Sequence, residues 1–527
     1  MSLDDKLTAY RYRILCISSE TRDYAKSLEE GIRVLNIYGF DFPSSPTVKD
    51  VVKEEMKVKL ALLNRPYSCL LDRPTAKNPI MELFKNLTRF ALLSGNDRLL
   101  RILCWRAIRL ALTKGIDHHF HTILVTLGSS MAKEKSEIKV AFEIATVAVH
   151  LSEKHREDRG NYAYTQLVAY QGVLLQLQSF RSGMDVMLQC YKDLKLAGEL
   201  DPALGSAMAH FLTIFAAGIP LGPLVESKLL LIEEFARKTE NNSFATIFQM
   251  QRQFVLNLWK PSDNPTELKG DAFDEEEILA ALNPTSKVYS MTLRDTSTYR
   301  LQLAFLFNDQ IIMRKMLDIL RNYPMTDISV PRFHLRLTFM GLSAFGLLQT
   351  SRDKTIEDVA KSCLAHFSSL SRLGSVNATP VYHFLLAMKQ PGIKSFELAI
   401  DSCAEASLPH LEAMAKERYG LYLCRQDNSI SIGQDYLVSA YWLYYNWGAH
   451  AKALEMWEEH ACIKTASKDK ANSRIGMASS VASVKSQKEK DQKLIEEKRK
   501  KGSLRKQLRF GRKSLRLKGK ATTSNLM

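Results

Sequence analysis

The residues best suited to metal chemistry lie at positions 117–121, where the sequence reads DHHFH. The candidate ligands are His118, His119 and His121. Zinc needs three or four ligands that converge tetrahedrally, and His118 and His121, three positions apart, could supply two of them. No partner pair is evident in the sequence, and Asp117 is more simply explained as the cap of the helix that follows. The pattern favours a helix cap, and a metal-dependent all-α hydrolase centred on this cluster is the alternative.

A group of five acidic residues could suggest cation binding or paired-carboxylate chemistry. It consists of Asp271, Asp274, Glu275, Glu276 and Glu277. These residues fall where a helix is expected to start, and the positive end of a helix dipole favours acids in its first turn. The spacing is not that of an EF-hand loop. A solvated helix start is therefore favoured over a cation site.

Other enzyme signatures are absent from the sequence. There is no G-x-x-x-x-G-K-[ST] segment, so no phosphate-binding loop with its lysine can form. A glycine-rich kinase loop and the H-R-D and D-F-G motifs are missing as well. We therefore expect no catalytic activity, no cofactor and no small-molecule substrate.

The positive charge of the chain is concentrated at its C-terminal end. Residues 464–527 contain twenty Lys or Arg and five Asp or Glu, which leaves a net charge near +1 for residues 1–463. The tail is predicted to be disordered or transiently helical. An adaptor that binds an anionic membrane or nucleic acid through this tail is a second alternative. Its candidate contacts are Lys498, Arg499, Lys500, Lys501, Arg505, Lys506, Arg509, Arg512, Lys513 and Arg516.

Composition indicates a globular intracellular protein. Of 527 residues, 46% are hydrophobic and 25% are charged, as in ordinary soluble domains. Eight cysteines are scattered singly, with no C-x-x-C pair, which is typical of reduced buried thiols. The N-terminal residues lack a signal-peptide pattern. We expect a cytoplasmic protein that is not secreted, with nuclear targeting through the tail as an alternative.

Residues 207–225 are free of Asp, Glu, Lys and Arg and approach the length of a membrane span. The sequence GIPLGP interrupts this stretch from residue 218 onward. The uninterrupted helical part is therefore only about a dozen residues, which favours a buried helix over membrane contact.

The body of the chain has the pattern of paired helices. Apolar residues recur at helical spacing from the N-terminus to about residue 460, and glycines at 39, 95, 115, 198 and 218 are placed as helix ends. Gly95 and Gly115 are twenty residues apart, as are Gly198 and Gly218, and this spacing predicts helix-pair units of about forty residues. We expect an all-α fold of roughly twenty helices, an αα superhelix over residues 1–463, with a lobe boundary within 259–273 and the tail at 464–527.

One aromatic-rich stretch near the end of this array is predicted to be a structural joint. Small residues let two helices approach, and aromatic side chains fill the space between them. A ligand site would also need converging polar groups, which the sequence does not identify. The predicted joint residues are Ala440, Tyr444, Trp447, Gly448, Ala449, Lys452 and Trp457.

This stretch resembles a known family. The pattern A-x-x-x-Y-x-x-W-G-A-x-x-K, over residues 440–452, is similar to the last tetratricopeptide-like helices of large AAA/STAND-type signalling ATPases. In these proteins a kinase-like domain and an ATPase precede the array, and in some a GAF domain and a histidine kinase follow it. Segments 27–47 and 250–279 resemble other parts of the same array, in the same order. The resemblance implies a helical region without the family's catalytic domains.

The sequence as a whole therefore predicts a non-catalytic, tetratricopeptide-like scaffold. Such an array is expected to bind another protein through its concave face. The resemblance adds the expectation of a sensor or regulatory role in an ATPase-type signalling assembly.

Overall fold

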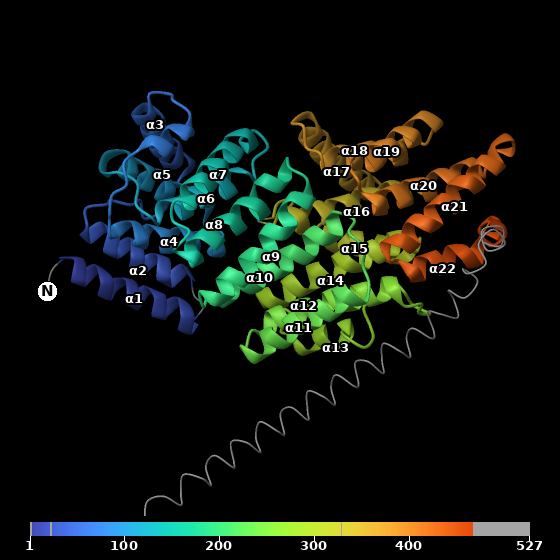
Figure 1. Cartoon of the computed structure of the whole chain (residues 1–527), viewed down its shortest axis with the longest axis horizontal. Coiled ribbons are helices and arrows are strands. Elements are labelled where there is room, and N and C mark those ends of the chain that lie inside the picture. The colour runs from blue at the N-terminus through green and yellow to red at the C-terminus, as the bar shows by residue number, and fades with distance from the viewer. Residues whose placement is uncertain (1–2, 22–23, 328, 467–527) are drawn as a thin grey trace, which may run out of the picture. The chain divides into compact units, whose positions relative to one another are not determined.

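The computed structural model describes residues 3–21, 24–327 and 329–466, which fold almost entirely as helices (Figure 1). The candidate contacts of the basic tail, between Lys498 and Arg516, lie outside these residues. Within the described ranges, backbone pairing of the β type is limited to isolated bridges, Thr75 with Ile116 and Lys269 with Asp274. The predicted all-α class is confirmed.

The helices follow one another with short connections. The first part of the chain contains α1 (Leu3–Thr21), α2 (Tyr24–Ile37), α3 (Val48–Leu62), η1 (Tyr67–Asp72), α4 (Ile80–Ser94), α5 (Asp97–Lys114), α6 (Phe120–Met131), α7 (Ile138–Glu153), α8 (Arg159–Gly172), η2 (Leu174–Gln176), α9 (Phe180–Leu196), α10 (Leu200–Ala216), α11 (Pro223–Lys238) and α12 (Asn242–Trp259). The second part contains α13 (Glu275–Ala281), α14 (Lys287–Leu306), α15 (Gln310–Leu320), α16 (Val330–Leu348), α17 (Lys354–Arg372), α18 (Ala378–Lys389), α19 (Ile393–Glu405), α20 (Pro409–Leu423), η3 (Asp427–Ser429), α21 (Ile430–Trp447) and α22 (His450–Glu459).

The glycines expected to end helices adopt the required backbone conformation. Gly39, Gly95, Gly115, Gly198 and Gly218 all have positive φ values, between 65° and 97°. At Gly95, which ends α4, the left-handed conformation lets the Gly95 N–H bond back to the last carbonyls of the helix. The positions of these helix ends were therefore readable from glycine placement.

The chain divides into two units, residues 1–456 and 457–527, and the division falls within α22. The break expected within 259–273 corresponds to the segment between Trp259, where α12 ends, and Glu275, where α13 begins. Both sides of that segment belong to the first unit.

Helices of the first unit pack mainly against their neighbours in sequence. Most consecutive helices are in contact, as are several pairs two positions apart, such as α4 with α6 and α16 with α18. Helix α16 also packs against α10 and α8, which come much earlier in the chain (Figure 1). A linear array requires no such contact, because each repeat touches only its neighbours. The superhelical arrangement stays a prediction.

A polar contact also joins segments that are far apart in sequence. The Asn377 side-chain amide donates to the backbone oxygens of Leu175, at 2.8 Å, and Gln178, at 2.7 Å. Its oxygen accepts from the Phe180 N–H at 3.1 Å, across 197 positions of the chain. Because Asn377 is only 3% exposed, these bonds satisfy backbone groups that water cannot reach. The connection between α8 and α9 is thus fixed by the start of α18.

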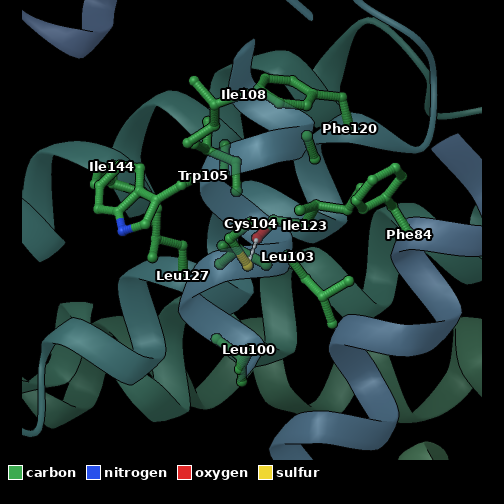
Figure 2. Packing of buried hydrophobic residues seen from close by; sticks show 14 of the residues in the cluster. Phe84, Leu100, Leu103, Cys104, Trp105, Ile108, Phe120, Ile123, Leu127 and Ile144 are labelled. Atoms are coloured by element: carbon green, nitrogen blue, oxygen red, sulfur yellow. Dashed lines mark hydrogen bonds between the residues drawn. The ribbon is translucent and has the colours of Figure 1, made fainter. Parts of the chain in front are cut away.

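The core of the N-terminal helices is formed where α4, α5 and α6 meet (Figure 2). Trp105 and Ile108 from α5, Phe120 from α6 and Phe84 from α4 are buried in this cluster. In Figure 2 the Trp105 ring lies toward Leu127 and Ile144. Cys104 is buried among them, and its thiol donates to the Ile123 oxygen at 3.6 Å. Burial raises the pKa of Cys104, so this thiol stays protonated and inert.

The uncharged stretch at residues 207–225 begins inside α10, which packs against α9. Phe211, Leu212 and Phe215 of α10 are buried. Of all helices described, none combines the length and apolar content needed to cross a membrane. The stretch consists of the second part of the core helix α10, a turn and the first residues of α11.

Candidate functional site

The histidine cluster begins in the short segment that connects α5 to α6. The backbone of this segment is tied to residues 74–76, since Ile116 N–H donates to the Pro74 oxygen at 2.8 Å. The Asp117 carboxylate is 2% exposed and accepts the N–H groups of His119, at 2.9 Å, and Asn78, at 2.8 Å. Asp117 therefore joins the segment before α6 to the segment that leads into α4. It is not the helix cap expected from the sequence, because α6 begins at Phe120 with His119 as its N-cap and has no side-chain cap hydrogen bond.

His119 is held by polar side chains from two other helices, α4 and α8. Its Nδ1 lies 3.1 Å from the Asn161 Nδ2 atom, and its Nε2 lies 3.4 Å from the Glu82 Oε2 atom. The Asn161 amide is oriented by Asp158, to which its Nδ2 donates at 2.6 Å, and by Lys85, which donates to its Oδ1 at 3.2 Å. Because Asn161 Nδ2 is a donor, His119 Nδ1 must accept, and the ring proton is on Nε2, facing Glu82.

The charges around this network fix its protonation. Burial lowers the pKa of His119, with help from Lys85 and His118, and outweighs the hydrogen bond with Glu82, which raises it; the net shift favours the neutral ring. Burial alone would raise the pKa of Glu82, but the hydrogen bond from His119 and the nearby Lys85 and Arg11 hold it at about 2. Glu82 is therefore an ionised acceptor between His119 and Arg11, with which it forms an ion pair.

Only part of the predicted ligand set converges. Asp117, His118 and His119 each place one ligand atom within 4.8 Å of the others. His121 points elsewhere: its Nδ1 lies 2.8 Å from the Thr165 hydroxyl. The expected pairing of His118 with His121 is therefore not found: the His118 side chain is 43% exposed, whereas His121 is buried.

The hydrogen bonds occupy the atoms that a metal would need. Coordination by His119 requires an unprotonated ring nitrogen, yet its Nδ1 lone pair is directed to Asn161 and its Nε2 proton to Glu82. The adjoining pocket, of about 540 Å³, is also lined by the cations Arg11 and Lys77. This geometry favours a structural polar network, and metal binding stays a hypothesis.

Replacing His119 with alanine is expected to lower the free energy of unfolding by about 1–3 kcal/mol, because Glu82 and Asn161 lose a partner in a largely buried site. Urea unfolding of the purified protein measures this. The control His118→Ala changes a ring that is 43% exposed and should alter stability by less than about 0.5 kcal/mol. One equivalent of bound Co²⁺, lost in both variants, would contradict the network and support a metal centre.

The acidic group at 271–277 is used to start a helix. Asp274 caps α13 by accepting the N–H groups of Glu276, at 3.0 Å, and Glu277, at 3.2 Å. Lys269 Nζ lies 3.5 Å from Asp274, and Glu275 pairs with Arg300. These contacts agree with the interpretation of the acids as a helix start.

The predicted joint contains fully buried aromatic side chains at the end of α21. Trp447 packs against Phe215, with ring centroids 5.4 Å apart, and against His410, at 5.3 Å. Its backbone oxygen accepts the Leu221 N–H at 2.7 Å. Gly448 ends the helix with a φ of 95°, and a Cβ there would lie 2.4 Å from the Leu221 oxygen. Only glycine fits this position.

The same region holds a buried ionic network. Lys452 Nζ is 2.8 Å from Glu417 Oε1 and 2.7 Å from Glu455 Oε2. The Tyr444 hydroxyl donates to the other Glu417 oxygen at 2.7 Å. Burial acts against both charges, but the mutual attraction outweighs it, raising the pKa of Lys452 and lowering that of Glu417. The pair is therefore ionised inside the protein.

The remaining predicted joint residues have different environments. Ala440, Ala449 and Lys452 are buried. Trp457 belongs to the second unit, where its side chain is 38% exposed and Lys464 Nζ lies 5.1 Å from its ring centroid.

Sequence reasoning missed Glu82 and Asn161 at the histidine cluster and Glu417 at the joint. One signal was present for Glu417: Lys452 lies between Ala449 and Ala453 on the small-residue face of α22, and a buried lysine requires a carboxylate partner. Nothing in the sequence singles out Glu82 or Asn161, because their contacts with His119 span 37 and 42 positions.

Comparison with known proteins gives no match: no family model, curated protein or solved structure matches the chain.

Helix α3 presents an exposed apolar surface that lies apart from the histidine cluster, the acidic group and the joint. Its inner face packs chiefly against α5, with Val51, Val58 and Leu62 buried. Its outer face carries five large apolar side chains that are 49–73% exposed. They follow one another at spacings of four, four, four and three residues: Val48, Val52, Met56, Leu60 and Leu63. We name these five residues the α3 ridge.

The α3 helix is well defined despite this exposure. Thr47 and Asp50 form a capping box in which the Thr47 N–H donates to the Asp50 carboxylate at 2.9 Å. At the other end, Leu63 adopts a left-handed conformation with a φ of 52°. The ridge is thus presented on a helix fixed at both ends.

Proposed function

We propose that this chain is a non-catalytic helical scaffold that binds a protein partner. The observation that carries the proposal is the α3 ridge, five apolar side chains exposed in one line on a capped helix. The opposite face of α3 already buries apolar residues against α5, so the ridge is not needed for the fold of the chain itself. Burial of such side chains drives protein association.

The residues that first suggested chemistry support the same conclusion. His119 and Asp117 are engaged in hydrogen bonds that connect separate segments of the chain. Each of these groups has a structural role that needs no substrate. The resemblance of residues 440–452 to the arrays of signalling ATPases supports a finer form of the proposal, a sensor or regulatory role in such an assembly.

The test replaces the centre of the ridge with glutamine, a good helix former that removes apolar surface (Val52→Gln, Met56→Gln, Leu60→Gln). The matched control replaces three exposed apolar residues on other helices (Leu196→Gln, Leu231→Gln, Ile311→Gln), which are 66–80% exposed. Full-length proteins are used for affinity capture from native lysate, followed by quantitative mass spectrometry.

We expect one protein to be retained by the wild type and the control, and at least about tenfold less by the ridge variant, since each lost apolar contact is worth about 1 kcal/mol. A partner retained equally by all three proteins would show that the ridge does not bind it. Failure of the wild type to retain any protein specifically would also contradict the proposal.

A further inference from the structure

The charges beside the α3 ridge are mainly positive. Lys49 and Lys53 are exposed on the outer half of α3, next to Val48 and Val52. The acids of the same helix are occupied: Asp50 is held in the capping box, and Glu55 accepts the Lys59 ammonium at 2.7 Å. The apolar ridge is therefore bordered by lysines whose charge is not balanced on α3 itself.

A positively charged pocket adjoins the same helix. It has a volume of about 380 Å³ and lies between α3, α5 and the segment around Asp41. One buried carboxylate, Glu54, is shared by three cations: Lys57 at 2.8 Å, Arg109 at 2.9 Å and Arg106 at 3.5 Å.

Three cations against Glu54 and Asp41 leave this pocket with excess positive charge. Burial would raise the pKa of Glu54, but Lys57, Arg106 and Arg109 lower it, so its own charge is already engaged. Arg109 and Lys57 keep 43% and 40% of their side chains exposed. They can therefore bind a further carboxylate from outside. Lys57 lies one turn after Lys53, so the pocket continues the basic border of the ridge.

The spacing of the ridge fits a helix as its counterpart. Side chains four residues apart form the ridges that fit into the grooves of a second helix at a crossing angle of about −50°. The side chains of the ridge are aliphatic, with no tryptophan or phenylalanine among them, which fits a protein groove better than the interface of a membrane. A second copy of this chain would place Lys49 and Lys53 near the same lysines, which is unfavourable.

We propose that the α3 ridge and the adjoining pocket bind an amphipathic helix of a different protein, with Asp or Glu along the border of its apolar face. One of these carboxylates enters the pocket and contacts Arg109 and Lys57. This inference rests on the proposed scaffold function and specifies the chemistry of the partner.

The experiment measures the affinity of the full-length protein for two fluorescent helical peptides of about 20 residues. Both carry the same leucine ridge at four-residue spacing, one bordered by glutamates and the other by lysines. We expect the wild type to bind the glutamate peptide at least about tenfold more tightly. The variant Lys49→Glu/Lys53→Glu should lose or reverse this preference, whereas Lys389→Glu/Lys394→Glu, at exposed positions of α18 and α19, should keep it.

Each other outcome overturns the inference. A preference for glutamate that survives the Lys49→Glu/Lys53→Glu change would place acidic binding elsewhere, for example on the basic tail. Dimers of the wild type that dissociate in the ridge variant would identify a second copy as the occupant. Vesicles of phosphatidylserine bound by the wild type and released by the ridge variant would identify a membrane.

The two proposals fail separately. If capture of a native partner depends on the ridge but neither peptide is preferred, the scaffold function stands and the acidic helix is wrong. If the wild type prefers the glutamate peptide as expected, but the ridge variant captures every native protein as well as the wild type does, the proposed surface chemistry stands and the scaffold function is wrong.

Discussion

Replacement of Lys452 by alanine is expected to lower the free energy of unfolding by about 3–5 kcal/mol, the largest effect of any single substitution considered. The variant leaves the Glu417 carboxylate inside the protein with only the Tyr444 hydroxyl as a partner. An unpaired buried charge costs more than the ion pair contributed, because its desolvation is no longer offset. Urea unfolding followed by tryptophan fluorescence reports the change, since Trp447 is buried in the same region.

The matched control removes both charges. In the double variant Glu417→Gln/Lys452→Met no carboxylate is left unpaired, and Tyr444 keeps an acceptor on residue 417. We expect this variant to recover at least half of the stability lost in Lys452→Ala. Equal losses in the single and double variants would show that packing volume, and not the buried charge, determines the stability of the joint.

Acidification from pH 6.5 to pH 4.5 is expected to destabilise the protein steeply. His121, His334 and His410 are buried, and burial lowers the pKa of each to about 3. In the unfolded chain these rings take up a proton near pH 6.5, but in the folded chain they do not. Stability is therefore full above pH 6.5 and decreases as the pH falls, by about 1.4 kcal/mol per pH unit for each ring.

Two carboxyl groups whose pKa is lowered by folding add to this loss of stability at lower pH. The pKa values of Glu82 and Glu417 are lowered in the folded protein, so their contribution is present above their ordinary range and is lost as the pH falls through it. Urea unfolding at pH 7.5, 6.5, 5.5 and 4.5 gives the slope. The variant His334→Met should lower the slope of stability against pH by the contribution of one proton, about 1.4 kcal/mol per pH unit, between pH 6.5 and 4.5. An unchanged slope would mean that His334 is protonated in the folded state.

The helices and their ends could be predicted because they depend on local sequence. A glycine at a helix end needs only its own left-handed conformation, as Gly95 and Gly448 show with φ values of 74° and 95°. Apolar spacing of 3.6 residues likewise indicates a helix whatever it packs against. The spacing does not say which apolar face is inside. On α3, Val51 and Val58 are buried, whereas Val52 and Met56 face outward.

The polar networks around His119 and Asn377 could not be predicted, because both depend on pairs that are distant in sequence. Asp117 and the three nearby histidines suggested a metal site by their density, but the environment of His119 is set by Glu82 on α4 and Asn161 on α8. The sequence contains many carboxylate and amide residues, and nothing in it indicates which of them contacts His119. The same applies to Asn377, whose three bonds to residues 175–180 are visible only once the chain is folded.

The Asn377 contact also has a consequence for the order of events during synthesis. At about 5–20 residues per second, the ribosome needs roughly 10–40 seconds to add the residues that separate Phe180 from Asn377. During that interval the backbone oxygens of Leu175 and Gln178 have already been made, but the side chain that binds them has not. The hydrogen bonds that fix the connection between α8 and α9 can therefore form only after the start of α18 has been made.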